Sequence, residues 1–163
     1  KRLSMDINVK VITPLKQFVI VPYIKGGVWD GELWLTLSVV EFVLNGKKYS
    51  IPAGFITDFG SIPRMARMTI DRMGKAAIGF VIHDWLREED EAAQPVSTKV
   101  ADLALYEIGL QYGETWWCMN KVYYSLRSFG WTADVGENEY GKVDIEVIRY
   151  ICHSNRLKLE TAI

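Results

Sequence analysis

The sequence contains few of the side chains on which acid–base and metal chemistry usually depend. Only two histidines and two cysteines occur among its 163 residues, and 19 basic against 20 acidic side chains give a formal net charge of −1. A chain this close to neutral has no overall electrostatic attraction to nucleic acids or anionic membranes. Cys118 and Cys152 show neither zinc-knuckle nor C-x-x-C spacing. This spacing indicates neither metal ligands nor a redox pair, and buried thiols are favoured over a disulfide.

Long apolar runs are missing as well. The first residues lack the apolar core of about 7 to 15 residues that a secretory signal needs, and no stretch approaches the roughly 18 uncharged apolar residues of a membrane span. We therefore expect no transmembrane segment and no secretion through a signal peptide. Hydrophobic residues make up 49% of the chain, which is enough for the core of a single domain over residues 1–163.

The two parts of the chain have different patterns. Residues 9–12, 18–21 and 33–40 are rich in β-branched and aromatic side chains and are expected as strands. Asn45-Gly46 between two apolar runs predicts a hairpin. Helices are expected over residues 74–89, 98–112, 114–129 and 143–160, with an N-cap at Ser97-Thr98. The predicted fold class is α+β: an N-terminal antiparallel sheet with hairpins (1–62), followed by a bundle of about four helices (63–163).

One titratable pair, His83-Asp84, stands inside an apolar run. In an interior such a pair costs several kcal/mol unless its hydrogen bonds are satisfied. Asp102 lies on the next expected helix, and two antiparallel helices can set its carboxylate against the imidazole. A neutral imidazole takes a proton from water while a carboxylate holds its other N–H. The three residues predict either a catalytic site, with His83 as general base and Asp102 orienting it, or a buried polar network that joins the helices.

This trio resembles the site of secreted and parvoviral phospholipases A2. In those enzymes the histidine is the base, the adjoining aspartate binds calcium and the distant aspartate orients the histidine. The resemblance implies that Asp84 is a calcium ligand, although it covers only three positions, and Arg87 stands where those enzymes often have tyrosine. In our hypothesis Asp58 joins Asp84 in holding a divalent cation, Ca²⁺ or Mg²⁺. No other cofactor is expected.

A polar loop connects the expected sheet to the expected helices. Residues 54–64 (GFITDFGSIPR) combine two glycines, an acid, two hydroxyls and an arginine. Asp58 and Ser61 can close local turns. Alternatively, Thr57, Asp58, Ser61 and Arg64 form a binding loop, because polar loops on a rigid sheet are common sites. Ser61 is not expected as a nucleophile, since no G-x-S-x-G sequence surrounds it.

Aromatic residues crowd the third expected helix, where Trp116-Trp117 and Tyr123-Tyr124 accompany Lys121 and Arg127. Packing in the core is the favoured interpretation, and stacking on bases or sugars is the alternative. Taken with the net charge, the sequence carries no strong nucleic-acid signal. His153 is expected to cap or pack a helix. Two histidines are too few for the multi-histidine metal sites of His-Asp phosphohydrolases.

Three ordered motifs resemble a domain of unknown function found mainly in tailed bacteriophages and prophages. They are G-F-x-T-D-x-x-S-I-P-R at 54–64, H-D-x-L at 83–86 and A-D at 101–102. The resemblance implies a phage origin and action in the host bacterial cytoplasm or on the virion, without naming a reaction. It leaves open whether the protein is an enzyme.

Two functional hypotheses follow from these observations. The first is a small phage hydrolase of the esterase or phosphodiesterase type that uses the His83, Asp84 and Asp102 site with a cation. The second is a non-enzymatic phage protein. Such a protein is either a tail or neck component of the virion or an inhibitor that binds a host defence factor or its nucleotide signal. The expected partners are accordingly a host or virion protein, or a small-molecule ligand.

Overall fold

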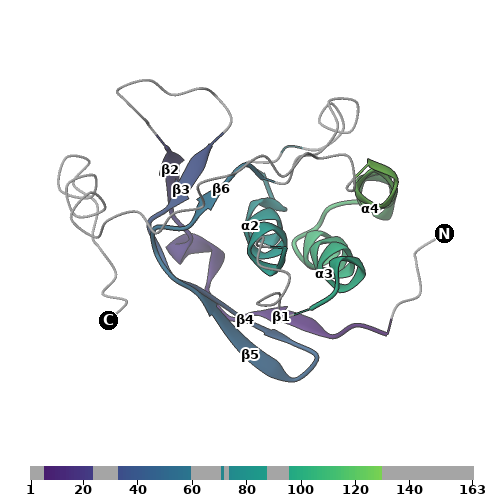
Figure 1. The fold of residues 1–163 in the computed structure, drawn as a ribbon, viewed down its shortest axis with the longest axis horizontal. Coiled ribbons are helices and arrows are strands. Elements are labelled where there is room, and N and C mark those ends of the chain that lie inside the picture. The colour runs from purple at the N-terminus through teal and green to yellow at the C-terminus, as the bar shows by residue number, and fades with distance from the viewer. Residues whose placement is uncertain (1–5, 24–32, 60–70, 72–73, 88–95, 130–163) are drawn as a thin grey trace.

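The computed structural model describes residues 6–23, 33–59, 71, 74–87 and 96–129. Within these residues, two three-stranded antiparallel sheets precede three α-helices in the chain (Figure 1). The predicted α+β class, with strands first and helices second, is confirmed. The expected helix over 143–160 lies outside the described residues, and the assignment of 1–163 to a single domain stays a prediction.

The first sheet contains β1 (Val9–Val11), β4 (Val40–Leu44) and β5 (Lys47–Ile51), with β4 in the centre. Strands β4 and β5 form the predicted hairpin. Asn45 and Gly46 connect them with φ angles of 50° and 81°. Two residues with positive φ are characteristic of a type I′ turn, whose twist matches that of the strands it joins. Alternate residues of β4 are buried, so this strand presents one apolar face to the core.

The second sheet contains β2 (Ile20–Pro22), β3 (Trp34–Thr36) and β6 (Ile56–Thr57), with β3 in the centre. The predictions of a single sheet and of a continuous strand over 33–40 were therefore wrong, because β3 ends at Thr36 and β4 begins only at Val40. Between them, Ser38 Oγ accepts a hydrogen bond of 2.9 Å from the Val19 amide. A serine hydroxyl that captures a backbone amide competes with the strand ladder. The chain passes from one sheet to the other at this point.

The three helices are α2 (Ala77–Leu86), α3 (Thr98–Gln111) and α4 (Trp116–Phe129). The predicted N-cap is confirmed, since Ser97 Oγ accepts the Val100 N–H at 3.4 Å. The expected helix over 74–89 is shorter in the structure, and the 3-10 helix η1 (Leu15–Gln17) was not predicted.

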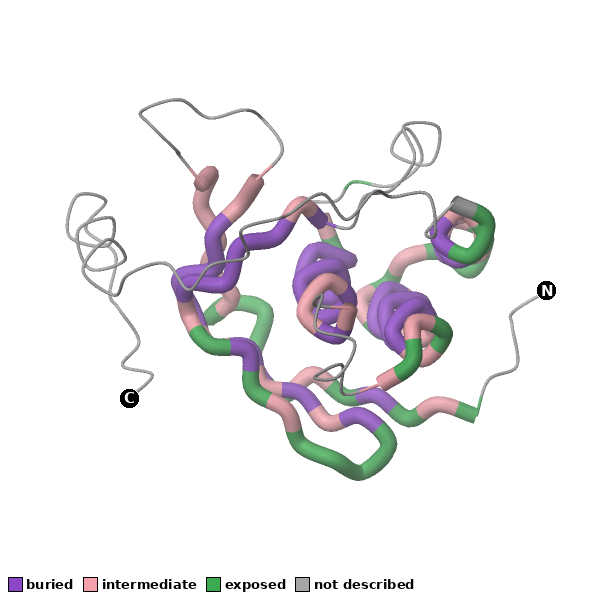
Figure 2. The backbone as a smooth tube through the Cα atoms, viewed as in Figure 1, coloured by how far each residue is buried: buried purple, intermediate pink, exposed green. Residues whose placement is uncertain are grey.

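Helix α2 is almost entirely buried and packs against α3 and β6 (Figure 2). The two helices are antiparallel: Gly79 lies against Leu105 and Ile108, whereas His83, one turn further along α2, faces Asp102 on an earlier turn of α3. A Cβ atom on Gly79 would lie 3.1 Å from side-chain atoms of both Leu105 and Ile108. The missing side chain therefore permits the close helix contact that brings His83 to Asp102.

Helix α4 covers the other side of α3 (Figure 1). It is antiparallel to α3, because Tyr106 contacts Tyr123 near the middle of both helices while Asp102 contacts Arg127 further along α4. As a result, the turn of α2 that carries His83, the turn of α3 that carries Asp102 and the turn of α4 that carries Arg127 lie next to one another. These three segments carry the candidate site.

Candidate functional site

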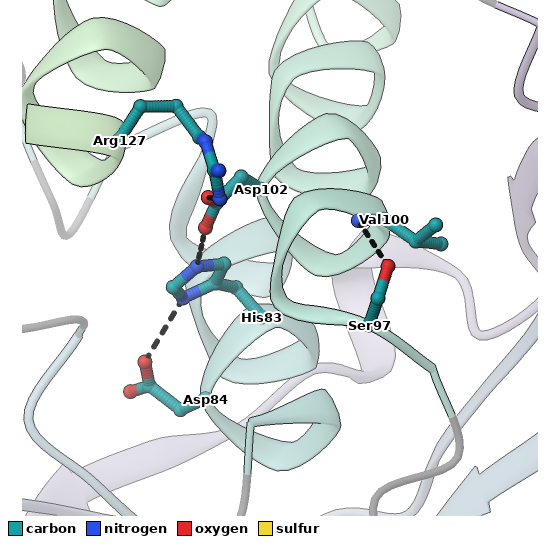
Figure 3. A network of polar contacts seen from close by, with 6 residues as sticks. All are labelled: His83, Asp84, Ser97, Val100, Asp102 and Arg127. Atoms are coloured by element: carbon teal, nitrogen blue, oxygen red, sulfur yellow. Dashed lines mark hydrogen bonds and ion pairs between the residues drawn. The ribbon is translucent and has the colours of Figure 1, made fainter. Parts of the chain in front are cut away.

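His83 and Asp102 form the closest polar contact of the candidate site. His83 Nε2 lies 2.8 Å from Asp102 Oδ1, and the two side chains come from facing turns of α2 and α3 (Figure 3). This distance lies within the normal range of a strong hydrogen bond between an N–H donor and a carboxylate. The structure therefore brings together the two residues that the sequence predicted as a pair.

The other ring nitrogen of His83 faces Asp84. Nδ1 lies 3.4 Å from Asp84 Oδ1, which is longer than the usual 2.7 to 3.2 Å of such hydrogen bonds. The two nitrogens are thus held unequally: Nε2 is bound tightly and Nδ1 loosely. Asp84 Oδ2 also accepts a hydrogen bond from the hydroxyl of Thr57 on β6.

Burial and charge together decide the protonation of His83. Its side chain is 1% exposed, and both nitrogens face carboxylate oxygens, which accept protons when ionised. Burial lowers the pKa of His83, but the hydrogen bonds and charges of Asp102 and Asp84 outweigh it, so the pKa is raised above the ordinary 6.5. The two carboxylates therefore stabilise the imidazolium form of His83, in which both nitrogens donate.

Arg127 on α4 completes the row of charges. Its Nη1 donates to Asp102 Oδ2 at 3.3 Å, and its side chain is 41% exposed (Figure 3). Asp84, His83, Asp102 and Arg127 therefore alternate in sign and sum to zero when the histidine is protonated. Alternation of this kind reduces the penalty of placing charges in an interior, because each charge has an opposite neighbour.

The predicted loop residues are only partly described. Thr57 is fully buried at the end of β6, and Asp58 follows it in a half-buried position. Ser61 and Arg64 lie outside the described residues, so the binding loop as a whole stays a prediction. His153 and Cys152 also lie outside them, whereas Cys118 is half-buried on α4.

The described residues do not by themselves assemble a cation site. They contain no group of three histidine, cysteine, aspartate or glutamate side chains able to hold a metal ion. Both oxygens of Asp84 already accept hydrogen bonds, from His83 and from Thr57. The divalent cation at Asp84 and Asp58 therefore stays a prediction.

The sequence analysis did not link two residues of the site, Arg127 and Thr57, to the carboxylates that they contact. Arg127 was grouped with the aromatic residues of its helix, and Thr57 was assigned to a binding loop without a link to Asp84. The sequence feature that could have linked Arg127 to the site was its position near the C-terminal end of the third expected helix. When consecutive helices pack antiparallel, that end lies beside the part of the preceding helix that contains Asp102. Nothing in the local sequence marks Thr57 as the partner of Asp84, since 27 positions separate them.

The aromatic residues of α4 divide between core and surface. Tyr123 is buried with Met119, Val122 and Leu126, as core packing predicts. Trp116, Trp117 and Tyr124 are 47%, 54% and 54% exposed, so core packing was wrong for these three. The Lys121 ammonium lies 3.3 Å from the centre of the Trp117 ring.

Residues 38–126, more than half of the chain, match a family described as "Protein of unknown function (DUF1353)". The chain belongs to the DUF1353 family. All three ordered motifs lie within the DUF1353 match, together with His83, Asp84 and Asp102, while Arg127 is the next residue after it. No curated protein and no solved structure matches the chain. Among the helices that the structure describes, none has the length and apolar character needed to cross a membrane.

Proposed function

We propose that this DUF1353 protein is a bacteriophage hydrolase that cleaves an ester or phosphodiester by acid–base catalysis at His83. The observation that carries the proposal is the 2.8 Å contact between His83 Nε2 and Asp102 Oδ1, buried between two packed helices. A carboxylate on one ring nitrogen fixes the tautomer and the orientation of the ring, leaving the other nitrogen for proton transfer.

The unequal contacts of His83 favour Nδ1 as the reactive nitrogen in this proposal. Its 3.4 Å contact with Asp84 is the weaker of the two, and the Asp84 side chain is 7% exposed whereas that of Asp102 is 0% exposed. A water molecule or a substrate oxygen therefore displaces the contact at Nδ1 more readily than the contact at Nε2. The base is the neutral ring, which forms as the pH rises through the raised pKa of His83. Nδ1 then takes a proton from the attacking water, and the resulting imidazolium returns it to the oxygen of the leaving alcohol.

The proposal of a phage origin rests on the order of the three motifs, all of which fall inside the family match. Action in the host cytoplasm or on the virion belongs to the same proposal. Comparing purified virions with lysates of infected cells by mass spectrometry separates these two locations.

Turnover of chromogenic substrates tests the reaction. We expect the wild-type protein to hydrolyse p-nitrophenyl esters or bis(p-nitrophenyl) phosphate, and His83→Gln to lower kcat by roughly 10²-fold or more. Leu44→Ala, which removes buried apolar contacts in the first sheet, is the control for lost stability and should retain activity below its melting temperature. Parallel assays with EDTA, Ca²⁺ and Mg²⁺ test the predicted cation. Equal activity of His83→Gln and wild type, or no turnover across the substrate panel, would contradict the proposal.

A second candidate function is favoured by the outer face of α4. Trp116, Trp117 and Tyr124 are exposed on this helix, and the Lys121 ammonium lies over the Trp117 ring. The described helix from Trp116 to Phe129 contains no acidic side chain. Rings that stack on a base and a cation that pairs with a phosphate suit a nucleotide. In this case the protein is a non-enzymatic phage inhibitor that sequesters a nucleotide signal of the host.

Calorimetric titration with linear and cyclic nucleotides tests this candidate. We expect Trp117→Ala to weaken binding by about 5- to 150-fold, because one stacked base contributes about 1–3 kcal/mol. Leu15→Ala, which alters an exposed apolar residue remote from α4 in sequence, should have no effect. Absence of nucleotide binding, or binding that Trp117→Ala leaves unchanged, rejects this candidate. Recovery of the protein in purified virions would instead point to a structural component.

A further inference from the structure

A single hydroxyl group connects the second sheet to the candidate site. Thr57 Oγ1 donates a hydrogen bond to Asp84 Oδ2 and accepts one of 3.0 Å from the Phe59 amide. Thr57 itself is fixed by the ladder between β3 and β6, in which it pairs with Trp34. The position of the Asp84 carboxylate is thus tied to the sheet as well as to its own helix.

The donors and acceptors of these two hydrogen bonds follow from the chemistry of the amide, the hydroxyl and the carboxylate. A backbone amide can only donate, so the Thr57 oxygen must accept from Phe59. The hydroxyl has one proton, and an ionised carboxylate only accepts, so that proton goes to Asp84. With Oδ2 held in this way, the other oxygen of Asp84 is turned toward His83 Nδ1.

The turn that supplies the Phe59 amide is itself held in an unusual conformation. Phe59 has a φ of 59°, in the left-handed region that bulky residues rarely adopt, and its side chain is fully buried. The ring packs edge-on against Trp34 of β3 and Phe80 of α2, with centroid distances of 6.0 and 6.4 Å. Packing on both sides maintains this conformation, which in turn keeps the amide on Thr57.

We propose that Thr57 is a positioning residue, which sets the Asp84 carboxylate and, through it, the partner of His83 Nδ1. Its role in turnover rests on the proposed function, whereas its effect on the His83 ring does not. The sequence placed Thr57 in a ligand-binding loop. The geometry assigns it instead to the support of the reactive nitrogen, because its hydroxyl is buried and already bonded to two groups of the protein.

The test compares Thr57→Val, which removes the hydroxyl but keeps the shape, with Thr57→Ser, which keeps the hydroxyl. Thr36→Val is a closely matched control. Thr36 is equally buried on the neighbouring strand, and its hydroxyl bonds only the backbone of Phe55 among the contacts described, at 3.0 and 3.3 Å. The two readouts are the ¹⁵N chemical shifts of the His83 ring and, where the wild type turns over substrate, kcat and KM.

We expect Thr57→Val to move the Nδ1 resonance while the Nε2 resonance changes less, and to lower kcat about tenfold with little change in KM. Thr57→Ser should restore both readouts, and Thr36→Val should leave them at wild-type values. An unmoved Nδ1 resonance in Thr57→Val, or equal changes in Thr57→Val and Thr36→Val, would overturn the proposal. If the wild type shows no turnover, the hydrolase proposal fails, and the NMR comparison still decides the role of Thr57.

Discussion

Replacing Asp102 by asparagine tests whether alternating charges hold the three helices together. Asp102→Asn preserves the size of the side chain and removes the charge that faces both His83 and Arg127. The side chain of Asp102 is 0% exposed, so water cannot take over the role of the lost charge at the Nε2 end of the ring. Removing one partner of a buried ion pair costs about 3–5 kcal/mol.

The penalty is limited because His83 can release its proton when its main partner loses charge. We therefore expect the lower end of the range, about 3 kcal/mol of unfolding free energy. For a domain of this size, each kcal/mol lowers the melting temperature by roughly 2–4 °C, which gives a fall of about 6–12 °C. Urea and thermal unfolding at pH 6, followed by circular dichroism, measure both quantities.

Arg127→Gln is the matched control for the same carboxylate. Its contact with Asp102 is longer, at 3.3 Å, and its side chain is 41% exposed. A partly solvated pair of this kind contributes about 0.2–1 kcal/mol. Equal losses in the two variants, or a loss below about 1 kcal/mol in Asp102→Asn, would refute the argument that the buried end of the network carries its stability.

Three further predictions concern pH and two glycines. Because the pKa of His83 is raised above 6.5, its contribution to stability is fully present below pH 6.5 and is lost as the pH rises through the folded-state pKa. Urea unfolding from pH 6 to 9 should therefore show a falling free energy of unfolding in the wild type, and this fall should be absent in His83→Gln. Its facing charged groups are Asp84 and Asp102, with Arg127 behind the latter. Gly46→Ala should lower the unfolding free energy by about 1–2 kcal/mol through backbone strain alone, since φ is 81° and no atom lies within 4 Å of the added Cβ. An unchanged urea midpoint would contradict the type I′ turn. Gly79→Leu should lower the unfolding free energy by about 1–3 kcal/mol and shift the Nε2 resonance of His83, because the leucine side chain would separate α2 from α3. A variant with unchanged stability and an unshifted resonance would show that the two helices need no close contact.

Local patterns in the sequence determined much of this fold. An Asn-Gly pair between two apolar runs predicted the hairpin of β4 and β5, because positive φ angles at both turn positions favour these residues. The N-cap at Ser97 was likewise recognisable within four residues. Even the contact between His83 and Asp102 could be predicted, since a titratable residue in an apolar helix needs a partner and the following helix carried one.

The tertiary structure alone decided the features that join distant segments. The sequence did not reveal that the strands divide into two sheets, that Trp117 faces outward, or that Arg127 backs the carboxylate of Asp102. It also did not connect Thr57 with Asp84, although both had been singled out. Periodicity and turn chemistry describe interactions within a few residues, whereas these features depend on which helix and strand surfaces meet after the chain has packed. Packing also raises the pKa of His83, because it sets the carboxylates of Asp102 and Asp84 against the imidazole, and their effect outweighs that of burial, which lowers the pKa.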